Sequence, residues 1–555
     1  MRAVVLLGGV VGAAMLAGPA LAQTPSIEDL MRRIDSLQKE VDQLKAERAA
    51  KPASPPAPAR TAKAAPPPAP AAKPAPAVAA ATPPQAPAPP APALAPVAAA
   101  PAPLDLTPQL AGAIPGLLPP EPMGSQFEDA LRSDLPGIAI RVPGTETEVR
   151  LYGFAKLSGY DDLGPRNQTD APPPQAIPLN ASPADQQGGD FGMTARFSRF
   201  GVDTRTLTGW GTLETRIEGD FGGGAPTSNN AVFRLRQAWG ELGTEQFRVL
   251  VGQANSLWNE GVFETLIDAT NLNQSFIRQA QLRVTGRLAP GVTGQVSLEA
   301  PDTQYTSVAG VFTPGTTFDG GASPAFNSAP DLLGRITYSA DGLEADTRGM
   351  LRDLSVRTAG TALAPPALTR DTLGWGLAGR VRFPMNWLSD DFGPDQLIAM
   401  GYYGEGIGRY FAGNTSGQDA LSNIGLPGTS TSFSVNAIPT YGLIAAYRRF
   451  WTTQLRSNLS FAAAWAEYPS YAHQFTPGSI SATSLNRDMQ QVFVNLIWSP
   501  FAQFTNGAVG TGWLDVGMEY LYTRRDIFGG AQATGTAGVG HGIANRLVGA
   551  AIVRF

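Results

Sequence analysis

The sequence predicts an all-β fold, a 16-stranded antiparallel transmembrane β-barrel, preceded by a short N-terminal coiled-coil helix and a Pro/Ala-rich linker. Three observations predict it. From about residue 149 to Phe555, apolar and polar side chains alternate with a period of two, as they do along strands. The predicted strands are joined alternately by short and long connections. The last predicted strand, residues 545–555, alternates throughout and ends on the aromatic Phe555.

Composition excludes most classes of enzyme chemistry. The chain of 555 residues has 41 Lys plus Arg, 46 Asp plus Glu, a formal net charge of -5 and no Cys. We expect no nucleic-acid partner, because such proteins carry a concentrated basic surface. Without cysteine there is no disulfide, thiolate metal site or cysteine nucleophile. The two histidines, His473 and His541, fall in predicted loops, so we expect no catalytic residues, no metal and no cofactor.

Residues 1–22 are predicted to be a secretory signal peptide. Arg2 precedes an apolar run over residues 3–16, and Ala20 and Ala22 place small side chains before the expected cleavage site. A retained N-terminal anchor is the alternative, although the apolar run is short for a membrane span. No later stretch reaches about 18 apolar residues, so we expect no transmembrane helix in the mature chain.

Residues 23–50 are predicted to form a coiled-coil helix that joins copies of the chain in the periplasm. Apolar residues recur at alternating spacings of three and four, the heptad pattern of a coiled-coil seam. They are Ile27, Leu30, Ile34, Leu37, Val41 and Leu44. The alternative is an amphipathic helix that lies on the rest of the protein. The seam does not settle the number of helices in the bundle.

Residues 51–103 are predicted to be a disordered linker. Of these 53 residues, 42 are Ala or Pro, a composition that cannot bury a core and that favours a semi-rigid polyproline II spacer. A pre-barrel segment, residues 104–148, is expected to connect this linker to the barrel.

Residues 149–555 are predicted to form the barrel, because charged and apolar side chains take opposite faces of the strands. Ile217 and Phe221 share one face of a strand, whereas Glu218 and Asp220 share the other. In a soluble β-sandwich the apolar face would be buried. In a transmembrane barrel it contacts lipid, and the charged face lines the lumen.

The pattern of connections favours the barrel over the sandwich. Strands ending near residues 206, 242, 288, 340 and 450 are joined to the next strand by a few residues. The long polar links are residues 161–190, 222–230, 255–275, 301–329, 406–437, 467–486 and 526–544. Short turns at one rim and long loops at the other are typical of bacterial outer-membrane barrels. Two turns, residues 384–394 and 500–512, are longer than this pattern predicts.

A row of arginines is predicted to line the lumen. An outward charge costs about 2 to 4 kcal/mol near the bilayer midplane, which favours the inward assignment. The candidate pore-lining and substrate-binding residues are Arg199, Arg205, Arg216, Arg234, Arg236, Arg248 and Arg283. Inward acids such as Asp203 are expected to pair with some of them. Residues 149–555 contain 28 Arg and one Lys against 33 Asp plus Glu, so net charge does not predict anion selectivity.

The third long loop carries acids that we expect to face this arginine row. They are Glu260, Glu264 and Asp268. If the loop folds inward, these carboxylates and the guanidinium groups would create a transverse field across a narrow constriction. Arginine suits such a site because its planar fork binds carboxylates through two hydrogen bonds and stays protonated. The alternative is wall charge that is neutralised internally.

Several strand segments resemble the DcaP-like outer-membrane porins. They are residues 150–156, 199–202, 215–221, 233–240, 404–410, 455–459 and 495–500. The resemblance implies a trimer of 16-stranded barrels, each with its own pore, and a preference for dicarboxylates or other small anions. It also implies pore-lining roles for Arg199, Arg216, Arg234 and Arg236. The linker and the loops of this chain depart from the family pattern.

Together these features predict a passive channel in the outer membrane of a Gram-negative bacterium. The expected partners are two further copies of the chain, outer-membrane lipid and small anionic solutes, with peptidoglycan as a candidate contact of the N-terminal helix. Two alternatives stay open. One is a non-selective diffusion porin whose arginines serve folding, and the other is a structural tether between the outer membrane and the cell wall.

Overall fold

The computed structural model describes residues 138–167, 170–224, 231–260, 264–266, 271–315, 323–358, 367–411, 419–429, 432–505, 508–510, 512–530 and 540–555. The predicted signal peptide, coiled-coil helix and linker lie outside the described residues, as does residue 268. The chain divides into two units, Met1–Ala88 and Pro89–Phe555, and the second contains every described residue.

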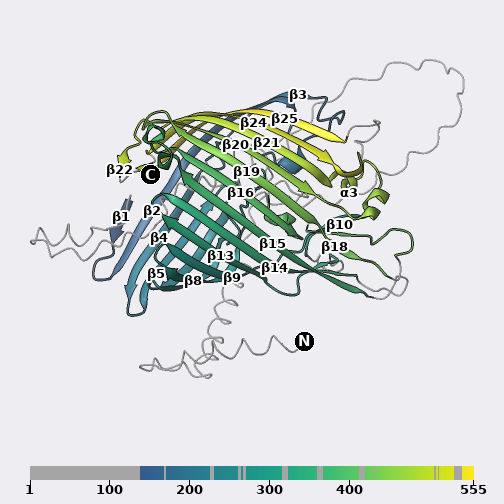
Figure 1. The fold of residues 1–555 in the computed structure, drawn as a ribbon, viewed down its shortest axis with the longest axis horizontal. Helices are drawn as coiled ribbons and strands as arrows, with labels where there is room; N and C mark the ends of the chain where they lie inside the picture. The colour runs from purple at the N-terminus through teal and green to yellow at the C-terminus, as the bar shows by residue number, and fades with distance from the viewer. Residues whose placement is uncertain are drawn as a thin grey trace, which may run out of the picture. The chain divides into compact units, whose positions relative to one another are not determined.

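Sixteen strand positions close into an antiparallel barrel, which confirms the predicted fold class. β3 and β4 share one position, because both pair with the long strand β2. The barrel strands are β2 (Thr147–Pro165), β3 (Gly188–Thr194), β4 (Arg199–Thr208), β5 (Gly211–Asp220), β6 (Arg234–Gly243), β7 (Phe247–Asn255), β8 (Arg278–Ala289), β9 (Val292–Glu299), β13 (Asp331–Ala340), β14 (Leu343–Arg357), β15 (Thr369–Pro384), β16 (Gln396–Glu405), β19 (Pro439–Phe450), β20 (Leu455–Ala466), β21 (Asn486–Trp498), β24 (Leu514–Ile527) and β25 (His541–Arg554). Figure 1 shows them side by side, from the blue β2 to the yellow β25.

The barrel closes where the first of these strands meets the last. β25 pairs with β2 from Arg546, opposite Asp162, to Arg554, opposite Phe154. Closure satisfies the backbone groups of both strands, which hydrocarbon could not do. β1 (Ile138–Arg141), from the predicted pre-barrel segment, pairs with the beginning of β2.

Short turns and long loops lie at opposite ends of the barrel. Figure 1 shows β10, β18 and α3 (Ile480–Thr483) at one end and β22 at the other. In the long loops, β10 (Tyr305–Ser307), β11 (Gly310–Phe312), β17 (Ala420–Ser422) and β18 (Val435–Ala437) form a separate four-stranded sheet. The other short elements of the long loops are η1 (Pro174–Ala176), β12 (Ala325–Phe326), η4 (Gly408–Tyr410), η6 (Ser470–Gln474) and η7 (Phe528–Gly530).

The structure accounts for the two unusually long turns. The turn after β15 contains two 3-10 helices, η2 (Met385–Trp387) and η3 (Asp390–Phe392). The turn after β21 contains a small hairpin of β22 (Phe504–Thr505) and β23 (Ala508–Val509). The structure also ends β14 at Arg357 and begins β15 at Thr369, a boundary that sequence reasoning did not identify.

The apolar faces of the barrel strands point outward. Ile217 is 61% exposed, whereas the next residue, Glu218, is 2% exposed. In β6, Leu235 is exposed while Arg236 is buried. Among the helices that the structure describes, none is long and apolar enough to cross a membrane. The strands therefore present a hydrocarbon-compatible outer surface and a charged inner one.

Candidate functional site

The predicted arginine row lies on the inward faces of five neighbouring strands, β4 to β8, and each arginine has a polar partner. Glu218 pairs with both Arg199 and Arg236. The remaining partners are Glu148 for Arg205, Asp203 for Arg216, Asp220 for Arg234 and Arg236, Glu241 for Arg248, and the side chain of Gln281 for Arg283. Six of the seven arginines therefore pair with a carboxylate, whereas Arg283 bonds to a neutral amide.

In several of these pairs the arginine side chain is more exposed than the acid, whereas Arg236 is as buried as its partners. The Arg234 side chain is 19% exposed, whereas that of Asp220 is 1% exposed. The values are 32% and 7% for Arg205 and Glu148. Because the carboxylates are buried behind the guanidinium groups, this part of the wall presents positive charge although its charges are largely paired.

The described parts of the loop between β7 and β8, residues 256–260, 264–266 and 271–277, lie inside the barrel. We call this loop the inward loop. Its backbone and side chains form hydrogen bonds with side chains and backbone carbonyls of several strands opposite β7. The backbone N–H of Leu272 donates to Gln491 of β21 at 2.8 Å. Asn273 donates to the carbonyl oxygens of Leu443 in β19 and Ala463 in β20 at 2.9 and 2.7 Å. The loop therefore crosses the interior rather than standing above the rim.

Aromatic packing fixes the beginning of the inward loop. The Trp258 side chain is fully buried, with ring centroids 6.3 Å from Tyr410 and 5.8 Å from Phe411. Gly376 of β15 makes room for the indole, because a Cβ there would lie 3.1 Å from the Trp258 ring. The same buried cluster includes Tyr402, which stacks on Phe411.

The two described loop acids differ from the expected arrangement, because they do not face the arginine row of β4 to β8. Glu260 pairs with Arg348 of β14 at 2.9 Å. Glu264 pairs with Arg456 of β20 at 2.5 Å and with Arg448 of β19 at 3.1 Å. Sequence alternation places these arginines on the inward face, but it cannot tell which wall a folded loop will meet. The third predicted acid, Asp268, lies outside the described residues.

The two loop acids have opposite pKa shifts. Burial raises the pKa of Glu260 to about 7, although Arg348 and the backbone N–H of Ser275 favour its ionised form. Burial also opposes ionisation of Glu264, but Arg456 and Arg448 prevail and lower its pKa to about 2. Glu264 is thus charged at neutral pH, whereas Glu260 titrates close to neutrality.

Sequence reasoning named pore-lining arginines only on the strands from β4 to β8, and it left out a second group of inward arginines. It comprises Arg335, Arg348, Arg352, Arg380, Arg448 and Arg456. The signal was available, since Arg348 and Arg352 alternate with the exposed Leu351 in β14. Asp346 pairs with three of them, Arg335, Arg348 and Arg380, each at 2.8 or 2.9 Å.

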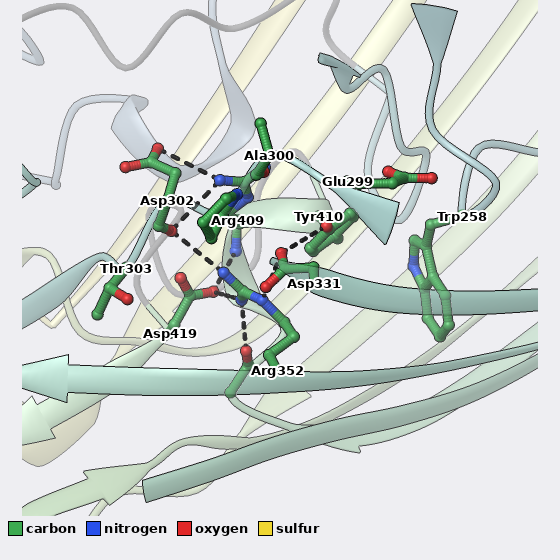
Figure 2. A network of polar contacts seen from close by, with 12 residues as sticks. Trp258, Glu299, Ala300, Asp302, Thr303, Asp331, Arg352, Arg409, Tyr410 and Asp419 are labelled. Atoms are coloured by element: carbon green, nitrogen blue, oxygen red, sulfur yellow. Dashed lines mark hydrogen bonds and ion pairs between the residues drawn. The ribbon is translucent and has the colours of Figure 1, made fainter. Parts of the chain in front are cut away.

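Arg352 anchors the loop that follows β16 to the barrel wall. Its guanidinium lies 3.0 Å from Asp331 and 2.7 Å from Asp419, and it donates to the Gly406 carbonyl at 2.6 Å. Figure 2 shows Arg352 between these acids, with Arg409 beside it. The Tyr410 hydroxyl donates to Asp331 at 2.7 Å. This network ties the loop end to the aromatic cluster around Trp258.

In the part of the chain that the structure describes, no group of three or more His, Asp or Glu side chains is arranged to hold a metal ion. His541 contacts Asn180 at 2.9 Å, and His473 packs on Phe528. The inner wall and the inward loop form the candidate functional site, and its chemistry is that of arginine–carboxylate pairs.

Comparisons with known proteins agree with this architecture. A family model described as "Porin subfamily" matches residues 141–516. A search of curated protein sequences finds no match. The outer membrane channel DcaP of Acinetobacter baumannii has a TM-score of 0.53 and 21% identity, over 74% of this chain and 97% of that chain. This similarity confirms the predicted resemblance at the level of the fold.

Two further solved structures are less similar. Vibrio cholerae OmpT, an outer membrane protein folded in vitro, has a TM-score of 0.41 and 10% identity, over 75% of this chain and 99% of that chain. Salmonella typhi OmpF in complex with daunomycin also has a TM-score of 0.41 and 10% identity, over 74% of this chain and 98% of that chain.

Proposed function

Because this chain belongs to the porin subfamily, we propose that it lets small anionic solutes diffuse through an arginine-lined pore. The family match and the closed barrel together show that the chain is an outer-membrane β-barrel channel for passive diffusion. We propose in addition that the channel prefers anions and that dicarboxylates are its preferred solutes.

The proposal rests on the difference in burial between the arginines of the wall and their carboxylate partners. Arg205 and Arg234 are partly exposed, whereas their partners Glu148 and Asp220 are buried. A solute in the lumen would meet guanidinium groups first and carboxylates only behind them. Coulomb interactions weaken with distance and are screened by water, so the nearer charges dominate the field. Net charge alone, which is negative, would favour the opposite selectivity.

Arginine also supports a preference for carboxylates. Its planar fork can donate two parallel hydrogen bonds to one carboxylate, and the side chain stays charged at any physiological pH. The wall pairs already show this geometry, since Arg234 donates to both oxygens of Asp220 at 2.9 and 2.8 Å. A carboxylate solute could therefore exchange for wall carboxylates as it passes.

Reversal potentials of single channels in a potassium chloride gradient test the proposal. We expect the native channel to prefer chloride. The double variant Arg205→Gln and Arg234→Gln should shift the reversal potential toward that of a cation channel. Arg287→Gln is the matched control, because Arg287 is exposed at a short turn beside Glu245, and it should cause a smaller shift. A native channel that prefers potassium would refute the anion preference.

We also propose that the protein is a homotrimer, with residues 23–50 as a periplasmic coiled coil. The heptad pattern of those residues and the resemblance to DcaP-like porins support this. Deleting residues 23–103 should leave single-channel conductance unchanged, since the barrel lies downstream. Native mass spectrometry in detergent would report the number of subunits with and without the deletion. A monomer from the undeleted chain would refute the trimer.

A further inference from the structure

Two consecutive arginines of β24 face opposite sides of the barrel wall. Arg525 is buried on the inner side, where it donates to the Gln175 carbonyl at 2.5 Å. Arg524 lies on the outer side with Tyr522 and the exposed Met518, and its side chain is 42% exposed. An outward charge on a barrel is costly at the bilayer midplane and costs little near the polar edge. Arg524 therefore marks the level at which the outer wall leaves the hydrocarbon.

This level belongs to the outer leaflet. β21 begins at Asn486, directly after the loop that contains α3, and β24 ends at Ile527, directly before the loop that contains η7. The long loops of outer-membrane barrels face the exterior of the cell. Arg524 is two residues beyond Tyr522, about 7 Å along the strand, and tyrosine typically lies at the membrane interface. The headgroup layer is about 6 Å deep, so lipid headgroups surround Arg524.

β21 adds a second exposed arginine beside the first. The ladder between β21 and β24 is irregular between Asn486 and Asp488, which leaves the Arg487 side chain 51% exposed and paired with Asp488. Arg524 pairs with Asp526 through hydrogen bonds of 2.9 and 3.0 Å. Both acids are less exposed than their arginines, at 32% and 22%. The guanidinium groups are therefore the outermost charges.

The ladder places these two ion pairs next to each other. Asp488 is directly opposite Asp526, and the exposed Gln490 is directly opposite Arg524. We call Arg487, Asp488, Gln490, Arg524 and Asp526 the outer-rim patch. Two acids directly opposite each other repel, and the two arginines offset that repulsion. The patch thus combines strong hydrogen-bond donors with acceptors on a surface that faces lipid headgroups.

A row of aromatic rings leads along the outer wall to this patch. Trp465 of β20 is directly opposite Asp488. Tyr441 of β19 stacks on Trp465 with 5.5 Å between the ring centroids, and Tyr403 of β16 stacks on Tyr441 at 6.2 Å. The three rings occupy successive partner positions in the ladder. Aromatic residues are common at membrane interfaces, but this row ends at charged groups.

We propose that the outer-rim patch and Trp465 bind the head of a phosphorylated glycolipid of the outer leaflet. The planar forks of Arg487 and Arg524 suit phosphate groups. The carboxylates and the Gln490 amide accept hydrogen bonds from sugar hydroxyls. The indole ring presents a negative face to the weakly positive C–H groups of a sugar ring. A lipid with phosphate but no sugar would engage the arginines alone.

The outer wall below the patch fits the acyl chains of the same lipid. Val494 and Leu496 of β21 and Met518 of β24 point outward, and they are 43%, 49% and 58% exposed. Their apolar side chains continue from the patch toward the membrane interior on the same two strands. The site lies on the outer side of the wall, so its role is separate from that of the pore.

Lipid titrations of the full chain in detergent, followed by native mass spectrometry, test the site. The probes are diphosphorylated lipid A and phosphatidylglycerol, and EDTA is present throughout so that no divalent cation bridges the lipid to the acids. We expect the native protein to bind lipid A more tightly. Arg487→Gln with Arg524→Gln should raise the Kd for lipid A about tenfold or more, the loss expected for a charged hydrogen bond. Trp465→Leu should weaken lipid A binding and leave phosphatidylglycerol binding unchanged.

Arg287→Gln with Arg449→Gln is the matched control, because these side chains are 46% and 35% exposed at the opposite, short-turn rim. It should change the Kd for lipid A at most about threefold. Heat-modifiable migration on gels reports folding, and if the double variant of the patch does not fold, Arg487→Gln alone should still weaken lipid A binding.

Three results would overturn the site. They are equal affinity of the native protein for both lipids, unchanged lipid A binding in the folded patch variant, and an equal loss in the control. Reversal potentials should be the same in the patch variant as in the native channel, because the substituted arginines lie outside the pore.

Discussion

Glu260 of the inward loop and Arg348 of β14 are 88 residues apart in the sequence and form an ion pair of 2.9 Å. Arg348 also donates to the Trp258 carbonyl at 2.6 Å, so one guanidinium holds two points of the loop. Arg335 adds a third contact, to the Asn259 carbonyl at 3.0 Å. The start of the inward loop is thus fixed to β13 and β14.

The raised pKa of Glu260 predicts channel properties that change near neutral pH. Burial raises this pKa to about 7, so protonation below that pH leaves Asp346 and Glu344 as the carboxylate partners of Arg335, Arg348 and Arg380. We expect anion selectivity to increase as pH falls from 8 to 6, measured as reversal potential. Glu260→Gln should remove this change, whereas Glu245→Gln, at an exposed turn, should retain it.

The raised pKa of Glu260 also determines whether its contribution to the free energy of unfolding increases or decreases with pH. A folded-state pKa above the unfolded value means that the folded protein binds the proton more tightly. The contribution of Glu260 to the free energy of unfolding is therefore complete below about pH 4.5, the ordinary value, and is lost as pH rises through about 7. Thermal unfolding in detergent should show Glu260→Gln gaining stability relative to the native chain at pH 8 but not at pH 4. A gain of equal size at both pH values would contradict the raised pKa.

Breaking the pair of Glu264 with Arg456 should be strongly destabilising. Both side chains are nearly buried and lie 2.5 Å apart, and the loss of one partner from a buried ion pair costs about 3 to 5 kcal/mol. Glu264→Gln should lower the melting temperature and increase current noise, because the loop loses one of its two contacts with β19 and β20 and keeps only that of Asn273. The double variant with Arg456→Gln should recover part of the loss. A double variant no better than the sum of the single ones would show that the two residues act independently.

Removing the Trp258 side chain should loosen the inward loop without opening the barrel. The side chain is fully buried between Tyr410 and Phe411, and truncation of a buried aromatic costs about 3 to 5 kcal/mol. We expect Trp258→Ala to raise single-channel conductance, while the barrel keeps its heat-modifiable migration on gels. Trp210→Ala, at an exposed short turn, is the control. Native conductance in Trp258→Ala would mean that the loop does not limit the pore.

Gly252 should be indispensable for the path of β7. Its φ is +125°, which side chains rarely adopt, and a Cβ there would lie 2.3 Å from the Ala238 carbonyl oxygen of β6. We expect Gly252→Ala to reduce the yield of heat-modifiable barrel sharply. Gly549→Ala is the matched control in β25, where a Cβ would meet no atom within 4 Å, and it should fold normally.

The local alternation of apolar and polar residues was enough to predict the barrel, but it did not predict the contacts of the inward loop. The alternation of Ile217 with Glu218 is a property of one strand, and repetition of that pattern defines the wall. The partner of Glu264 is 192 residues away and depends on how the loop crosses the interior, which no local period encodes. The alternation of apolar and polar residues also did not predict the break between β3 and β4. At residues 195–198 the chain leaves the ladder, and Arg196 pairs with Asp170 at 2.5 Å in a long loop.

The seam between β2 and β25 constrains how the protein is assembled. Until residues 541–554 have docked, β2 and β24 each expose a row of unsatisfied peptide groups, which lipid cannot hydrate. A partly inserted sheet therefore has no stable resting state, and the open form needs shielding by a chaperone before it reaches the bilayer. A proteolytic cut that removes β25 would therefore give an aggregation-prone open sheet rather than a smaller pore.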